Sequence, residues 1–122
     1  MTKQLTVKGC VFCRSNGLLE DEVVAASDDA YVLIPVTSPQ NYLIIPEAHY
    51  TGLEQLPDNW WHEVKACLAN LPGLDDYNLS INLGEQAGQR LKHLHFWVIR
   101  RQAGKPSSAK GLAALIAQLD DA

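Results

Sequence analysis

The sequence has few cysteines, no long apolar run and no excess of positive charge. It has three cysteines, and an odd count argues against the disulfide framework of a small secreted protein. No apolar run approaches the roughly 18 residues that span a bilayer, and the N-terminus lacks the apolar core of a signal peptide. A net charge of −4 excludes a general electrostatic affinity for duplex nucleic acid or anionic membranes. These absences predict a cytosolic protein, and a local positive site could still hold a small anionic ligand.

Length and composition are those of one globular domain. The chain has 122 residues, of which 47% are hydrophobic and 20% are charged. A chain of this size hides roughly two-thirds of its unfolded surface on folding, which is enough for a real core. We therefore expect residues 1–122 to form a single domain.

The hydrophobic pattern predicts an α+β fold with an antiparallel sheet of about five strands. Strand-like segments lie at 22–27, 31–35, 42–45, 78–83 and 92–101. In the last two segments apolar and polar residues alternate, so that one face of the sheet is buried and the other is polar. We expect these two segments to pair through the glycine-bearing loop 84–89.

Two helices complete the expected fold. Apolar residues recur at helical spacing from Trp60 to Leu71, with Asp58 as the expected N-cap and Pro72 as the stop. The apolar stripe of this helix would pack on the sheet. A short C-terminal helix is expected after Ser107, with its own apolar stripe. The residues of this second stripe are Leu112, Leu115, Ile116 and Leu119.

His93 and His95 are the first candidates for chemistry. Two histidines that are two positions apart on a strand point the same way, so both can serve one site. The alternative is a pair of exposed or core histidines with no chemical role. The polar strand and the glycine loop directly before them favour a site, which would also carry Asn82.

Cys10 and Cys13 have the spacing of two ligands to one tetrahedral metal. A redox pair or two unremarkable thiols are the alternatives, although the strand–helix pattern expected around a thioredoxin-type pair is not seen. Structural zinc needs two more ligands. His62 should be solvated on its helix, whereas His49 and His93 would complete the zinc site and leave His95 free to react.

The loop Gly84–Gln89 is a candidate phosphate cradle. Glycines let backbone N–H groups approach a phosphate, and concave amide clusters bind anions. A simple turn is the alternative. The position of the loop directly before the two histidines favours the cradle.

These residues together resemble the histidine triad (HIT) family. Asn82, Gly84, Gly88-Gln89 and His93-Leu94-His95 follow in the order of the family signature, over the segment NLGEQAGQRLKHLHFWVIRR. The segment LIIPEAHY, which contains His49, is similar to the family's strand-Pro-x-x-His segment. Cys10-Val11-Phe12-Cys13 is similar to the zinc-binding start of many bacterial members. The resemblance runs from about Cys10 to Arg101.

The resemblance implies cleavage of a nucleotide at its α-phosphate through a nucleotidyl-histidine intermediate. His95 would be the nucleophile, supported by Gln89 and Asn82. A neutral imidazole is available near pH 7, and a covalent step splits one difficult displacement into two. Structural zinc would hold the fold, and no catalytic metal would be required. Substrates of the dinucleoside polyphosphate or nucleoside phosphoramidate type are expected, as is a homodimer like those of some family members. Trp60, Trp61 and the C-terminal apolar stripe are candidate contacts of that dimer, and packing in the core is the alternative for these residues.

The chain departs from the family pattern at several positions. Trp97 replaces the third histidine, and its indole N–H can donate one hydrogen bond but cannot transfer a proton. Gln40-Asn41 replaces a Gly-His pair that is common in the family. The acidic residue that often binds the ribose has no clear match, since Leu33 and Ile34 occupy that region. The nucleotide or phosphate site is expected to comprise Gly84, Gly88, Gln89, Trp97 and Asn41. The departures leave open a catalytically impaired nucleotide-binding or scaffold protein of the same fold, or a zinc-stabilised interaction module.

Overall fold

A computed structural model describes residues 6–105 of the chain. Its strands are β1 (Glu22–Ala26), β2 (Ala30–Ile34), β3 (Tyr42–Pro46), β4 (Tyr77–Ile81) and β5 (Phe96–Arg100). The helix α1 covers Trp60–Ala69, and the short 3-10 turns η1, η2 and η3 cover Arg14–Asn16, Leu53–Gln55 and Glu85–Ala87. The expected C-terminal helix lies outside the described residues.

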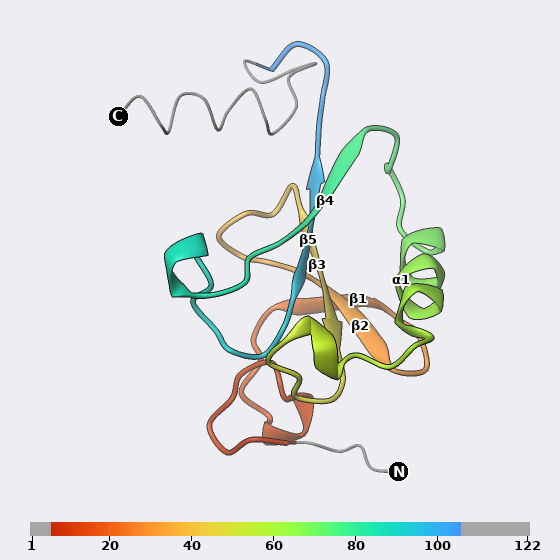
Figure 1. Cartoon of the computed structure of the whole chain (residues 1–122). Coiled ribbons are helices and arrows are strands. Elements are labelled where there is room, and N and C mark those ends of the chain that lie inside the picture. Colours follow the sequence, from red (N-terminus) through yellow and green to blue (C-terminus); the bar gives the residue numbers. More distant parts are fainter. Residues whose placement is uncertain (1–5, 106–122) are drawn as a thin grey trace.

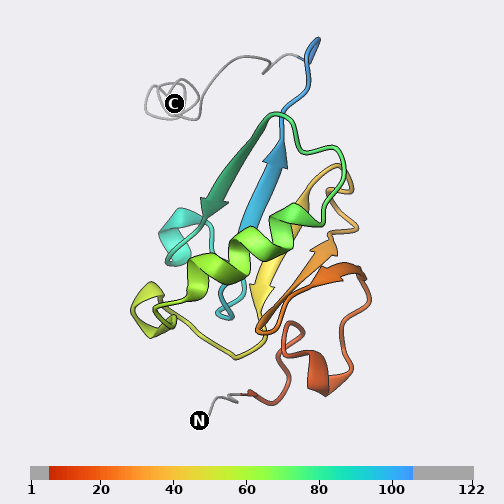
Figure 2. The same ribbon diagram turned by 90° about the vertical axis from the view of Figure 1, so that its right-hand side faces the viewer.

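The five strands form one sheet in the order β1-β2-β3-β5-β4, and every neighbouring pair is antiparallel. Figures 1 and 2 show α1 lying across one face of this sheet. An antiparallel sheet with a packed helix confirms the expected α+β fold, including the pairing of the last two strands through the glycine-bearing loop.

The sheet has a separate apolar cluster on each face. On the α1 face, alternate residues of the strands pack against Trp60, Val64 and Cys67 of the helix. On the opposite face, the cluster comprises Phe12, Tyr31, Leu33, Leu43 and Ile45. Because strand residues alternate between faces, Phe96 packs against the helix while its neighbour Trp97 packs against the opposite cluster.

Two local expectations about α1 and β4 need correction, and one pair of alternatives is decided. The helix begins at Trp60 after Asn59, and no side chain caps it, so Asp58 is not the N-cap. Trp61 is 57% exposed, so of the two alternatives core packing holds for Trp60 and not for Trp61. Strand β4 ends at Ile81, so Leu83 lies beyond the sheet and is exposed.

The strand expected over residues 92–101 is also shorter, because β5 begins only at Phe96. The backbone N–H of Leu94 donates to the carbonyl of Tyr50 at 2.8 Å, so this stretch follows the loop after β3 instead of the sheet ladder. His93 and His95 therefore precede β5. They still lie on the face away from α1, since both rings contact Phe12.

Candidate active site and metal centre

Four side chains converge near the end of β3: Cys10, Cys13, His49 and His93. Their ligand atoms all lie within 4.8 Å of one another. The Cys13 Sγ lies 3.4 Å from the His49 Nδ1 and 3.5 Å from the His93 Nδ1, and the Cys10 Sγ lies 3.5 Å from the same His93 nitrogen. Ligand atoms around one tetrahedral zinc ion are separated by roughly 3.3–3.8 Å, given zinc–ligand bonds of about 2.0–2.3 Å. The structure thus brings together the four residues expected to bind zinc, and the three sulfur–nitrogen spacings given above fit this ion.

The N-terminal loop holds the two cysteines in place. The Asn16 side chain donates to the carbonyls of Val7 and Cys10 at 2.8 and 2.9 Å, which closes the loop. The Val7 N–H points at the Cys13 Sγ at 3.4 Å, an arrangement that favours a thiolate. Burial raises the pKa of the Cys13 thiol, so a bound dication would supply the charge that keeps the thiolate ionised.

The ring of His93 is oriented as a metal ligand. It is fully buried, and its Nε2 lies 2.7 Å from the carbonyl oxygen of Pro46. A carbonyl only accepts, so Nε2 carries the proton and Nδ1 presents its lone pair to the two sulfurs. Burial lowers the pKa of His93 to about 4, so the ring is neutral at pH 7. A carbonyl that accepts from the other ring nitrogen and so fixes the tautomer is typical of metal-binding histidines.

His95 is half-buried and has a different partner. Its Nδ1 lies 2.9 Å from the carbonyl oxygen of His93, so Nδ1 carries the proton and Nε2 keeps a free lone pair. The Phe12 ring packs edge-on against the imidazole, with ring centroids 5.2 Å apart. With Nδ1 held by this carbonyl, Nε2 is the nitrogen that the ring can offer for nucleophilic attack.

The glycine loop is a self-braced turn. Gly84 and Gly88 both have φ of +96°, a conformation that suits glycine. The backbone N–H groups of Ala87, Gly88 and Gln89 all donate to carbonyls within the loop. The Gln89 side chain accepts from the Gly84 N–H and donates to the carbonyls of Leu91 and Lys92. In this conformation the loop amides and Gln89 bond to the protein itself.

Asn82 and Trp97 lie at the end of β4 and β5 at which His95 precedes the sheet. Ile81 pairs with Phe96, so Asn82 and His95 are the next residues beyond the ladder on their two strands. The Asn82 side chain also lies against Gly88, with Nδ2 only 3.4 Å from the position that a Cβ would take there. Trp97 follows on the same face as His95 and is partly buried against the Phe12 cluster.

Asn41 is not brought to His95. Its side chain is buried, donates to Ser38 Oγ at 2.7 Å and accepts from the Arg100 N–H at 3.0 Å. Arg100 is five residues beyond His95 along the chain, roughly 16 Å away at the rise of an extended strand. Asn41 therefore braces the opposite end of β5.

Phe12 and Asn16 were not singled out from the sequence. Phe12 stands inside the Cys10–Cys13 spacing, so its position next to the metal ligands was the available signal. No sequence motif marks Asn16. A residue that closes a loop by hydrogen bonds to two backbone carbonyls can bond to carbonyls of any residue type, so no characteristic sequence spacing identifies it.

Comparisons with known proteins identify the family of this chain. The model of the HIT domain family matches residues 17–104. The chain belongs to the HIT family. A HIT-like protein of Methanocaldococcus jannaschii, itself uncharacterised, is 32% identical over 105 residues, which cover 78% of this chain and 81% of the relative.

Two other relatives of the HIT chain carry named activities. Adenylylsulfatase HINT3 of Arabidopsis thaliana is 32% identical over 106 residues, covering 76% of this chain and 52% of that protein, so the match spans only about half of it. Adenosine 5′-monophosphoramidase HNT1 of Saccharomyces cerevisiae is 28% identical over 114 residues, covering 86% of this chain and 70% of that protein.

Solved structures share the fold of this HIT protein. A histidine triad protein from Clostridium difficile matches with a TM-score of 0.66 at 25% identity, covering 83% of this chain and 97% of the other. A zinc-bound histidine triad family protein from Mycobacterium smegmatis also matches with a TM-score of 0.66, at 23% identity, covering 93% and 96% of the two chains.

Proposed function

We propose that this HIT-family protein is a nucleotide hydrolase or nucleotidyl transferase that cleaves at the α-phosphate through a nucleotidyl-His95 intermediate. Two relatives named for reactions of adenylyl sulfate and adenosine 5′-monophosphoramidate support the class of reaction. The observation that carries the proposal is the His95 tautomer. Its Nδ1–H is engaged by the His93 carbonyl, which leaves the Nε2 lone pair for phosphorus.

The proposed chemistry has two displacements. The Nε2 of His95 attacks the α-phosphorus, a P–N bond forms, and the bond to the leaving group breaks with its electron pair on that group. Water or another acceptor then attacks phosphorus, the P–N bond breaks, and His95 recovers its lone pair while the acceptor loses its proton to solvent. The acceptor decides between hydrolysis and transfer.

The residues proposed to hold the phosphate are Gly84, Gly88, Gln89 and Asn82, with Trp97 at the border of the site. The Gln89 side chain and the N–H groups of Ala87, Gly88 and Gln89 already bond to the protein, so anion binding would require them to exchange these bonds for phosphoryl oxygens. Asn82 follows the last ladder pair of β4 and β5, and His95 precedes it, which favours Asn82 as a contact at the same end of the sheet. We leave Asn41 out of this set, because its side chain braces β5 elsewhere.

In this proposal zinc is bound by Cys10, Cys13, His49 and His93 and has a structural role. It would tie the N-terminal loop to the residues preceding β5, while the reaction uses no catalytic metal. We place the protein in the cytosol, where thiols stay reduced and available to a metal. No helix within residues 6–105 is both long enough and apolar enough to cross a bilayer.

Replacing His95 tests the proposal. With adenosine phosphoramidate, adenylyl sulfate and a dinucleoside polyphosphate as substrates, His95→Ala should lower kcat by about a thousandfold or more, because the nucleophile is gone. The matched control is His62→Ala, which removes an exposed histidine on α1 and should leave the rate unchanged. An alkaline quench with substrate labelled in the α-phosphate should trap an adduct on His95 in the wild type, because a P–N bond to imidazole survives base and hydrolyses in acid.

A catalytically impaired binding protein is the competing outcome, favoured by Trp97 at the position of the third family histidine. Nucleotide binding without any trapped adduct, and with equal background rates for wild type and His95→Ala, would support this alternative and remove the proposed mechanism.

We further propose that the HIT protein forms a homodimer through β4 and the neighbouring apolar groove. Strand β4 is a free edge of the sheet and carries no charged residue, whereas the other edge, β1, has Glu22 and a bulge. Charges and bulges are devices that block edge pairing, so β4 is the edge open to a second copy.

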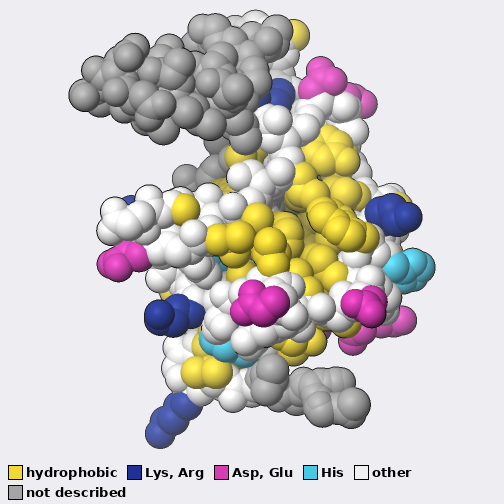
Figure 3. Space-filling view, viewed as in Figure 1, with side chains coloured by type: hydrophobic (Ala, Val, Ile, Leu, Met, Phe, Trp, Pro, Cys, Tyr) yellow, Lys and Arg dark blue, Asp and Glu magenta, His cyan; other side chains and the backbone are white. Residues whose placement is uncertain are grey.

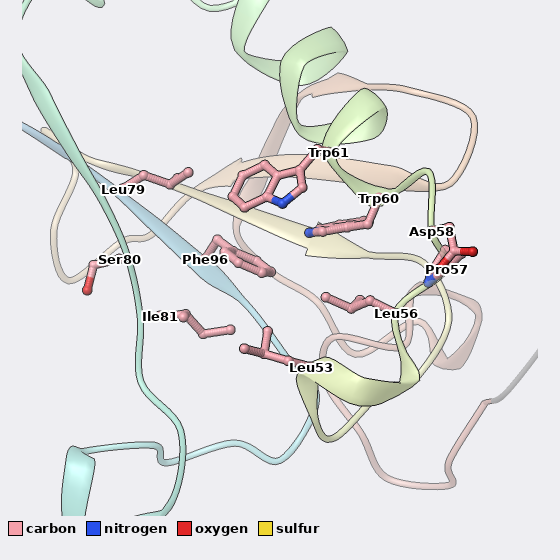
Figure 4. Close-up of a pocket in the computed structure, with 10 residues that line it drawn as sticks. All are labelled: Leu53, Leu56, Pro57, Asp58, Trp60, Trp61, Leu79, Ser80, Ile81 and Phe96. Atoms are coloured by element: carbon pink, nitrogen blue, oxygen red, sulfur yellow. The ribbon is translucent and has the colours of Figure 1, made fainter.

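The groove beside β4 supports the same partner. It is a cavity of about 370 Å³ whose apolar walls come from η2, α1, β4 and β5. Figure 3 shows the apolar surface around it, and Figure 4 shows the Trp60 indole nitrogen directed into it. That nitrogen is buried and has no hydrogen-bond partner within residues 6–105. A second copy would cover the apolar walls of the groove.

A further inference from the structure

We propose that Phe12 is a positioning residue that fixes the ring of His95 and thereby links the metal-binding loop to the reacting nitrogen. This inference rests on the proposed function, in which His95 is the nucleophile. It concerns a residue that contacts the nucleophile from the side and takes no part in bond making.

Phe12 is held rigidly on the face of the sheet that carries the site. Its side chain is buried in the cluster with Tyr31, Leu33, Leu43 and Ile45. Its carbonyl accepts a buried hydrogen bond from the Tyr31 hydroxyl at 2.7 Å. Both the core packing of the side chain and the hydrogen bond to its carbonyl set the position of Phe12. Its ring can therefore restrict the orientation of a neighbouring ring.

The ring of His95 requires a second contact to fix its orientation. A single hydrogen bond from Nδ1 to the His93 carbonyl fixes one point of the imidazole, and a ring held at one point can still swing. Phe12 provides the second point, because its ring meets the imidazole at 5.2 Å and an angle of 70°. Edge-to-face contacts of this kind are favourable and directional. Together the two contacts define where the Nε2 lone pair points.

The same residue connects His95 to the metal centre. Phe12 stands between the two cysteine ligands, and its ring also meets the ring of the ligand His93 at 6.1 Å. The position of Phe12 therefore follows that of Cys10 and Cys13. Holding the cysteines on one metal ion would hold Phe12 against His95, without the ion taking part in the reaction.

Two variants at Phe12 test the inference. Phe12→Leu keeps an apolar side chain but removes the ring, and should lower kcat by on the order of tenfold to hundredfold with little change in KM, because the nucleophile is misaligned. Phe12→Tyr keeps the ring and should restore most of the rate. Leu33→Ala is the matched control, since Leu33 belongs to the same cluster and should lower stability without lowering kcat.

Measurements independent of turnover separate this inference from the proposed function. Zinc content per chain should be unchanged in Phe12→Leu. In nitrogen NMR of the imidazoles at one fixed pH, His95 should show a single tautomer in the wild type and in Leu33→Ala, and mixed signals in Phe12→Leu. A cross-relaxation signal between the Phe12 and His95 rings should be present in the zinc-loaded wild type and weaken after chelation.

Several results would overturn the role of Phe12 while leaving a catalytic His95 intact. They are a wild-type kcat and a single His95 tautomer in Phe12→Leu, an equal loss of kcat in Leu33→Ala, or a rise in KM alone, which would make Phe12 a nucleotide contact. If Phe12→Leu fails to fold, the cross-relaxation signal in the wild type still decides, because its absence in the zinc-loaded protein would refute the contact.

Discussion

His93 and His95 are identical side chains two residues apart, and their carbonyl partners give them different chemistry. In His93 the N–H of Nε2 donates a hydrogen bond to the carbonyl of Pro46, so the lone pair of Nδ1 faces the sulfurs. In His95 the N–H of Nδ1 donates to the carbonyl of His93, so Nε2 is the nitrogen with a lone pair. The first arrangement suits a metal ligand and the second suits a nucleophile.

The Cys13 side chain is expected to be essential for the metal centre. Cys13→Ser should lose zinc and destabilise the protein by about 3 kcal/mol or more, because a ligand that contacts both histidines is replaced by a weaker one. The melting temperature should fall on the order of 10–20 °C. Metal analysis and thermal unfolding measure the two effects.

Cys67→Ala is the control for that experiment. Cys67 is buried on the sheet-facing side of α1, and burial raises the pKa of its thiol, so it should act as an inert core residue. This variant should keep its zinc. Equal zinc content in Cys13→Ser and the wild type would contradict the assigned ligand set.

At the scale of the element, α1 contains a buried carboxylate, Glu63, that the apolar periodicity of the helix did not predict. Glu63 is only 3% exposed, and its Oε1 accepts from the Ser27 hydroxyl at 2.6 Å and the Asp29 N–H at 2.9 Å. The hydrogen bond from Ser27 is the main cause that lowers the pKa of this carboxyl below its ordinary value of 4.5. The carboxylate thus anchors the helix to the turn between β1 and β2.

Glu63 should make stability depend on pH at the acid end. Because its pKa is lower in the folded protein than in the unfolded chain, its contribution is complete above pH 4.5 and is lost as the pH falls through the folded pKa. Glu63→Gln should lower the free energy of unfolding by about 1–2 kcal/mol at pH 7. This difference from the wild type should shrink below pH 4.5.

Denaturant unfolding at several pH values gives the measurement. Glu54→Gln, at an exposed position of η2, is the control and should leave the stability unchanged. A difference between wild type and Glu63→Gln that stays constant down to pH 3 would show that the charge on Glu63 is not what anchors the helix.

The periodicity of apolar residues predicted which segments form helices and strands. It did not predict where each element ends or which residues hydrogen-bond to it. The recurrence of Val64 and Cys67 located α1, because burial against a sheet imposes helical spacing. The same pattern could not decide whether Trp61 is in the core or on the surface, and it did not identify Glu63 as buried. Periodicity sorts residues by polarity alone and carries no information about a hydrogen-bond partner such as Ser27. Strand β5 begins later than expected because the Leu94 N–H donates to the Tyr50 carbonyl instead of to the sheet. This contact joins segments that are distant in sequence, so a local pattern does not predict it.

At the scale of the whole molecule, the metal centre joins segments that are far apart in sequence. Cys10 and His93 are 83 positions apart, yet their ligand atoms lie 3.5 Å apart. No local pattern determines such a contact. The four-residue set could be predicted because zinc requires four ligands and the chain has few candidates. Asn41 shows the limit of this reasoning, because resemblance assigned it to the phosphate site while the sheet topology places it at the other end of β5.

The proposed dimer makes its own prediction at this scale. Trp61 is 57% exposed at the edge of the groove beside β4, as Figure 4 shows, and a second copy that covers the groove would bury it. Trp61→Arg would place a charge in that interface without disturbing the core, so it should convert a dimer to a monomer. Val36→Arg is the matched control, because Val36 is 71% exposed in the loop after β2. Sedimentation over a range of concentrations measures the mass, and a wild type that is monomeric at the highest concentration, or a Trp61→Arg that remains dimeric, would refute this interface.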